Sequence, residues 1–62
     1  MITAEDMVPV LARGGLLIVK HNGRRRAVID ARKVGRTQWR VSFTRGAPVT
    51  VAPDDAFHRL AR

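Results

Sequence analysis

The chain has 62 residues, no cysteine and a formal net charge of +7, and ten of its twelve basic residues are arginine. A chain this short forms one domain, residues 1–62, and buries only about 60% of the surface that its unfolded form exposes. The lack of cysteine excludes disulfides and thiolate metal sites, and the wide separation of His21 and His58 argues against a histidine metal site. No apolar run approaches the roughly 20 residues that span a bilayer. Glu5 and Asp6 precede every lysine and arginine, unlike the order in a signal peptide, so we expect a cytoplasmic protein.

The N-terminal segment, residues 1–15, has the signals of a short helix. Thr3 is a candidate N-cap with Asp6 three residues later, and Gly14 is a fitting stop. Its apolar residues at helical spacing are Met7, Val8 and Leu11. Pro9 opposes a regular helix, because proline beyond the first turn removes a hydrogen bond. We therefore predict a short or kinked helix, with an irregular extended arm as the alternative.

From residue 16 onward the pattern is that of β-strands. Four runs with strand character follow one another: residues 16–21, 26–33, 38–44 and 48–52. Turn signals separate them at Asn22-Gly23, residues 34–36 and residues 45–47, and Asn-Gly is a strong type I′ hairpin turn. Strands repeating at this short spacing predict a mainly β fold, a small barrel of four to five antiparallel strands over residues 16–62.

A register follows from these turns. The predicted pairs are Ile18 with Ala27, Leu16 with Ile29, Ala31 with Trp39, Ile29 with Val41, Phe43 with Val49 and Val41 with Val51. All of these side chains then share one face, which is predicted to be the core. The same register places Asp30 across from Arg40 on the outer face.

The other face of the first strand is also apolar and needs a cover. Leu17, Val19 and Val28 form this patch, a candidate interface. Either residues 1–15 cover it or a homodimer does. At the C-terminus, residues 53–60 predict a helical turn capped by Asp54, with Phe57 and Leu60 pointing back into the barrel.

The basic residues are concentrated in the middle of the chain. Between Met7 and Pro53 there are ten basic residues and one acid, Asp30, a local net charge of +9. Such density destabilises a compact domain through self-repulsion unless a polyanion neutralises it, although a solvated basic face is the simpler alternative. The candidate nucleic-acid-binding residues are Lys20, Arg24, Arg25, Arg26, Arg32, Lys33, Arg36 and Arg40. Arg24 to Arg26 lie at a hairpin mouth, where flexible cations reach phosphates.

The order of strands, turns and a terminal apolar turn resembles the SH3-like small barrels. That superfamily includes Tudor and KOW modules, DNA-binding domains of some integrases, and plasmid-type dihydrofolate reductases. The segment Val49-Thr50-Val51-Ala52-Pro53 is similar to the Val-x-Ile-x-Pro strand of the reductases. The reductases place a catalytic glutamine and tyrosine where this chain has Thr50 and Ala52, so the resemblance implies the fold and argues against that activity. An aromatic cage of the Tudor type is not expected either, because the chain has only Trp39, Phe43 and Phe57.

These observations favour a binding protein over an enzyme. Trp39 keeps the strand period of its neighbours and is predicted to be core, although it could instead stack on a base. His21 is predicted to flank a turn at the surface, and His58 to pack on Phe57. No Ser-His-Asp set, phosphate loop or carboxylate pair can be assembled, so no cofactor is expected. We predict a small nucleic-acid-binding protein with mainly electrostatic backbone recognition and weak sequence selectivity, such as a phage or plasmid accessory protein. Either a monomer or a homodimer is compatible with this prediction. The alternative is an interaction module that docks on an acidic protein.

Overall fold

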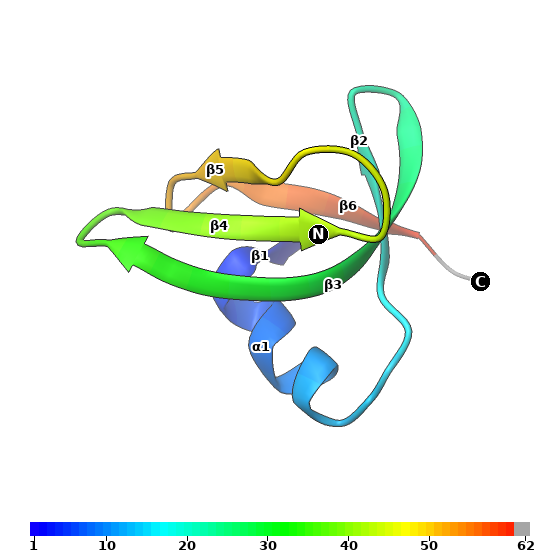
Figure 1. The fold of residues 1–62 in the computed structure, drawn as a ribbon, viewed down its shortest axis with the longest axis horizontal. Coiled ribbons are helices and arrows are strands. Elements are labelled where there is room, and N and C mark those ends of the chain that lie inside the picture. Colours follow the sequence, from blue (N-terminus) through cyan, green and yellow to red (C-terminus); the bar gives the residue numbers. More distant parts are fainter. Residues whose placement is uncertain (61–62) are drawn as a thin grey trace.

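The strands of this protein form one antiparallel sheet with a helix packed on one face. In the computed structural model, which describes residues 1–60, the elements are β1 (Ile2–Thr3), α1 (Ala4–Ala12), β2 (Ile18–His21), β3 (Arg24–Gly35), β4 (Gln38–Phe43), β5 (Val49–Val51) and β6 (Ala56–Leu60). The sheet order is β1-β6-β2-β3-β4-β5, and Figure 1 shows α1 lying beneath β3. The prediction of a mainly β fold is confirmed. β1 and β5 are the edges, so the sheet is open, and residues 61–62 of the predicted barrel lie outside the described residues.

The N-terminal segment forms the predicted short helix. The Thr3 hydroxyl accepts a hydrogen bond from the Asp6 amide at 3.4 Å, which satisfies one of the free N–H groups of the first turn. Gly14 ends the segment with a φ of +74°. Pro9 lies inside the helix, and the Met7 side chain is fully buried in the core. The alternative of an extended arm is therefore excluded.

The core face was predicted correctly for the second half of the sheet and inverted for the first half. Leu17, Val19 and Val28 are buried, whereas Leu16 and Ile29 are 50% and 57% exposed. The cause is a register shift between Val28 and Asp30 that inserts one extra residue into β3. Such a bulge reverses which alternate residues face the core. Before the bulge the buried residue is the even-numbered Val28, and after it the buried residue is the odd-numbered Ala31.

This inversion also corrects the predicted interface. Leu17, Val19 and Val28 belong to the same core cluster as Met7 of α1 and Phe43 of β4. The N-terminal segment is thus the cover that these side chains need, and they offer no surface to a partner.

The pairing in the β3–β4–β5 meander differs from the prediction by two residues. Ile18 does pair with Ala27, but Ala31 pairs with Val41, and Val49 pairs with Val41 rather than Phe43. The turn between β3 and β4 falls at residues 36–37, and the connection to β5 spans residues 44–48, which is longer than predicted. Because side chains alternate with a period of two, a two-residue shift leaves the same residues on the core face.

The C-terminal segment forms a strand, not the predicted helical turn. β6 pairs with β1 and β2 at once, with Phe57 opposite Ile2 and Leu60 opposite Ile18. Asp55 rather than Asp54 stabilises the preceding turn, since its carboxylate accepts a hydrogen bond from the Ala52 amide at 3.0 Å. A strand at this place satisfies backbone groups of β1 and β2 that a helical turn would leave unpaired.

Candidate nucleic-acid interface

The β2–β3 hairpin carries the arginine run on a tight turn. Asn22 and Gly23 have φ angles of +51° and +77°, as the Asn-Gly signal predicts. Arg24 and Arg25, the first residues of β3, are both exposed. Since the hairpin bends the chain back at once, these two cations project beyond the body of the sheet.

A cationic row crosses the outer face next to this hairpin. Val19 points into the core, so its neighbour Lys20 points outward. Lys20 is paired with Arg25 on one side and with His58 on the other. Residues directly opposite in an antiparallel pair project from the same face. Arg25 and Lys20 therefore present two adjacent positive charges.

Arg26 faces the opposite way, and this was not predicted. It is paired with Val19, so its side chain lies on the core side of the sheet at the open end of the core. Its guanidinium carbon lies 3.8 Å from the centre of the Phe43 ring. Its Nη2 donates hydrogen bonds to the Arg45 carbonyl at 2.8 Å and the Ala47 carbonyl at 3.3 Å. Arg26 thus fastens the β4–β5 loop to the hairpin.

His21 completes this arrangement and is half-buried, which corrects its predicted surface position. Its ring stacks on Phe43 with centroids 5.9 Å apart, and it lies 5.9 Å from the Phe57 ring at a tilt. Nη1 of Arg26 lies 3.4 Å from His21 Nδ1. Arginine can only donate, so this contact is a hydrogen bond in the tautomer whose Nδ1 carries no proton.

The β4–β5 loop closes the other side of the site. Gly46, with a φ of +81°, lets the loop pass close to Arg26: a Cβ at this position would lie 2.6 Å from Nη2. The Thr44 amide donates to the Ala27 carbonyl at 3.0 Å and joins the start of the loop to β3. The carbonyls of Arg45 and Ala47, which follow in the loop, are thereby within hydrogen-bond distance of the Arg26 guanidinium.

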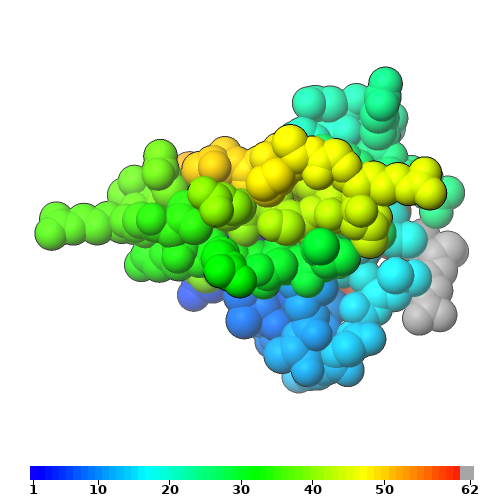
Figure 2. Space-filling model, viewed as in Figure 1, coloured from blue at the N-terminus to red at the C-terminus, as the bar shows by residue number. Residues whose placement is uncertain are grey.

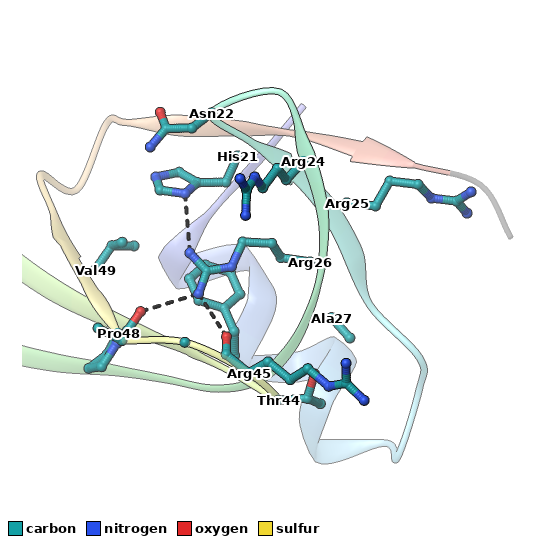
Figure 3. Close-up of a pocket in the computed structure, with 13 residues that line it drawn as sticks. His21, Asn22, Arg24, Arg25, Arg26, Ala27, Thr44, Arg45, Pro48 and Val49 are labelled. Carbon is teal, nitrogen blue, oxygen red and sulfur yellow. Dashed lines mark hydrogen bonds between the residues drawn. The ribbon is translucent and has the colours of Figure 1, made fainter.

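Between the hairpin and this loop lies a hollow of about 660 Å³, which we call the hairpin hollow. Its lining includes four arginines, Arg24, Arg25, Arg26 and Arg45, and no acidic residue among the described ones. Figure 3 shows Arg26 in the centre, whereas Arg25 and Arg45 point outward from the rim. Arg45 was not among the predicted site residues. Arg45 lies in a loop, where side chains do not alternate in a regular pattern. Its position beside the arginine run depends on the pairing of β3 with β4, which the sequence did not predict correctly.

The remaining predicted binding residues lie elsewhere on the sheet. Lys33 and Arg36 are at the β3–β4 turn, which lies at the end of the molecule away from the β2–β3 hairpin (Figure 1). Figure 2 shows both of these ends projecting from the body. The structure therefore places these two cations at the opposite end of the sheet from the arginine run.

Arg32 and Arg40 lie between these ends, directly opposite each other in the β3–β4 pair. The predicted contact between Asp30 and Arg40 is wrong, because Asp30 is paired with Ser42. Asp30 instead accepts hydrogen bonds from the Arg32 side chain on its own strand, with an Nη2 to Oδ2 distance of 3.0 Å. The pair is 68% and 46% exposed, so its contribution to stability is at most about 1 kcal/mol.

Comparisons of the chain with models of protein families, with curated proteins and with solved structures found no match. Neither these comparisons nor the geometry of residues 1–60 indicates a catalytic activity. Within the same residues, no group of three or more His, Asp or Glu side chains is placed to hold a metal ion. None of the described helices is long and apolar enough to span a membrane.

Proposed function

We propose that this protein binds nucleic acid through the rim of the hairpin hollow, mainly by contacts to the phosphate backbone and with weak sequence selectivity. The observation that carries the proposal is the meeting of arginines from two elements, the hairpin and the β4–β5 loop, around one hollow that no described acidic residue lines. Arginines of separate segments thus surround one hollow, and their like charges repel one another, although Arg25 and Arg45 point outward from the rim. A polyanion relieves that repulsion and releases its own counterions on binding.

The proposed binding surface contains exposed cations at two places, the rim of the hollow and the adjacent outer face. Arg24, Arg25 and Arg45 lie at the rim of the hollow, and Lys20 extends the same positive region across the outer face. Long, exposed side chains of this type fit phosphates, whose spacing varies little with sequence. Arg26 contributes charge as well, but its hydrogen bonds to the loop fix its position.

We also propose that the fold is a small barrel of the SH3-like type. Strands β2 to β5 form a meander, and β6, which follows β5 in the chain, returns to pair with β2, which supports this assignment. Small barrels often bind nucleic acids on a curved face. We retain a cytoplasmic location as part of the proposal.

The test is a binding titration against mixed-sequence duplex DNA and single-stranded RNA across a salt series. We expect a log–log slope on the order of −3 to −5, as about four or five released counterions imply. The double change Arg24→Ala with Arg25→Ala should reduce that slope by about two. Its matched control is Arg13→Ala with Arg59→Ala, which removes the same charge from exposed positions outside the hollow. No binding at low salt, or equal effects of the two double changes, would overturn the proposal.

A second candidate function is an interaction module for an acidic protein or for a second copy of the chain. A specific observation favours it: the bulge in β3 leaves apolar side chains on the outer face. This outer apolar patch consists of the exposed Leu16 and Ile29 and the half-buried Ile18, Ala27 and Leu60, of which Ile18 pairs directly with Ala27 and Leu60. Sedimentation of the protein and of Ile29→Glu over a range of concentrations tests the dimer. A concentration-dependent dimer that Ile29→Glu abolishes supports that form of the function, and a monomer throughout contradicts it.

A further inference from the structure

We infer that the hairpin hollow receives an unpaired nucleobase, stacked on the guanidinium of Arg26, so that the protein prefers single-stranded or bulged nucleic acid to a perfect duplex. The inference rests on the proposed function and adds to it a particular site and a class of substrate.

The Arg26 guanidinium is a fixed plane, unlike the other arginines of the hollow. Hydrogen bonds to the carbonyls of Arg45 and Ala47 and to His21 fix the orientation of the guanidinium. The Phe43 ring packs against one of its faces. An arginine side chain loses considerable rotamer freedom when a ligand orders it. At Arg26 the fold has already imposed that order.

Arg26 is only partly buried and lines the hollow, so a ligand there can reach it. Phe43 covers one face of the guanidinium, and Arg26 lies in the middle of the lining of the hollow (Figure 3). Guanidinium planes stack on nucleobases in recognition of unpaired nucleotides, and each stacked base contributes appreciably to affinity whatever its identity. A cavity of about 660 Å³ is within the range that holds small ligands.

Hydrogen-bonding groups at the site can engage the same nucleotide. The three contacts of Arg26 use three of the five N–H groups of a guanidinium, which leaves two that point within its plane and can donate to a phosphate beside the stacked base. Asn22 and Thr44 also line the hollow, with an amide and a hydroxyl that both donate and accept. Groups that can reverse their role select weakly among bases, in keeping with low sequence selectivity.

A perfect duplex does not present a free base to the hollow. In a duplex, both faces of each base are covered by its neighbours, so a base reaches the hollow only if it is first extruded at a cost in unstacking. A perfect duplex therefore meets only the rim cations. A single strand, or a duplex with one unpaired nucleotide, meets the rim and the Arg26 plane together.

The experiment compares four ligands at one salt concentration: a DNA single strand, a perfect duplex, the duplex with one bulged nucleotide, and the same bulged duplex with an abasic bulge. We expect the bulged duplex to bind about tenfold more tightly than the perfect duplex, and the abasic bulge to lose that advantage. The abasic ligand changes the nucleic acid and not the protein, so it is independent of folding. Equal affinity for the abasic and intact bulges overturns the inference and leaves the proposed function standing. A lack of binding to all four ligands overturns both.

A protein variant provides the second test. Arg26→Lys retains the charge but removes the plane, and we expect it to abolish the preference for the intact bulge over the abasic one. Arg25→Lys is the matched control, because it makes the same chemical change at the rim and should preserve the preference. Urea unfolding establishes that both variants are folded under the binding conditions. A folded Arg26→Lys protein that still prefers the intact bulge contradicts the inference.

Discussion

The two ends of the sheet carry similar charge but use it differently. At the β2–β3 hairpin, Arg26 contacts an aromatic ring, two loop carbonyls and a histidine. At the β3–β4 turn, Lys33 and Arg36 are exposed and make no hydrogen bond or ion pair with other described residues. The face from which a basic residue projects therefore does not by itself decide its role. Arg26 is in phase with buried Val28 and Lys33 with buried Ala31, but of these two only Arg26 has hydrogen-bond acceptors among the described residues.

The largest expected effect is the loss of stability when the fixed arginine is removed. Arg26→Ala deletes two charge-assisted hydrogen bonds and the contact with Phe43, so we expect the free energy of unfolding to fall by about 2–3 kcal/mol. That is a large share of the stability of so small a domain. Urea unfolding measures it, with Arg25→Ala as the control, expected to change stability by about 0.5 kcal/mol or less. If both changes cost the same, Arg26 does not fasten the loop.

A change at Gly46 tests the contact between Arg26 and the β4–β5 loop from the loop side. Gly46→Ala combines an unfavourable backbone conformation, at φ +81°, with a Cβ that would lie 2.6 Å from Arg26 Nη2. Gly14→Ala is the control, since its φ is +74° and nothing lies within 4 Å of its added Cβ. We expect a loss of about 1 kcal/mol for Gly14→Ala from backbone strain, and about 1 kcal/mol more for Gly46→Ala.

The excess cost at Gly46 should depend on Arg26. In an Arg26→Ala background, Gly46→Ala should cost no more than Gly14→Ala, because the clashing group is gone. Unfolding of the double variant measures this coupling. An excess that persists without Arg26 would show that the loop itself, and not the guanidinium, resists the change.

The two halves of the sheet were also unequally predictable from sequence. In β4, Trp39, Val41 and Phe43 alternate with polar residues, and the structure buries Val41 and Phe43 and half-buries Trp39. Leu16 to Val19 is apolar at every position, so alternation could not decide which side faces inward. The bulge near Ile29 decided it, and a bulge leaves no sign in a run where Val28 and Ile29 are both apolar.

The same bulge explains what was missed at the candidate site. With the face inverted, Arg26 changes from an outer cation to a half-buried one, and His21 moves with it to the core side. The exposed rim residues Arg24 and Arg25 were predictable, because they depend only on the Asn22-Gly23 turn. The hollow was not, because it needs the register of β4 and the path of residues 44–48.

A smaller effect concerns the second basic end. Lys33→Ala with Arg36→Ala should leave the affinity for a strand of about six nucleotides within twofold, because a ligand of that length occupies one small-barrel site. The double change Arg24→Ala with Arg25→Ala should weaken the same complex much more. Fluorescence anisotropy with the short strand measures both. A larger loss from the Lys33 and Arg36 changes would place the principal site at the β3–β4 turn and contradict the proposed division.

The smallest expected effect concerns the middle of the sheet, where Arg32 and Arg40 face each other across β3 and β4. Like charges directly opposite are destabilising, and Asp30 offsets this through its contact with Arg32. Asp30→Asn should therefore lower stability by about 0.5 kcal/mol at low salt, and by less at high salt because the charges are exposed. In an Arg40→Gln background the same change should cost less, since Arg32 then has no opposing cation. Asp30→Asn costs that are equal in the two backgrounds would show that Asp30 stabilises the strand only through its own pair with Arg32, and that the facing arginines are too well solvated to repel each other.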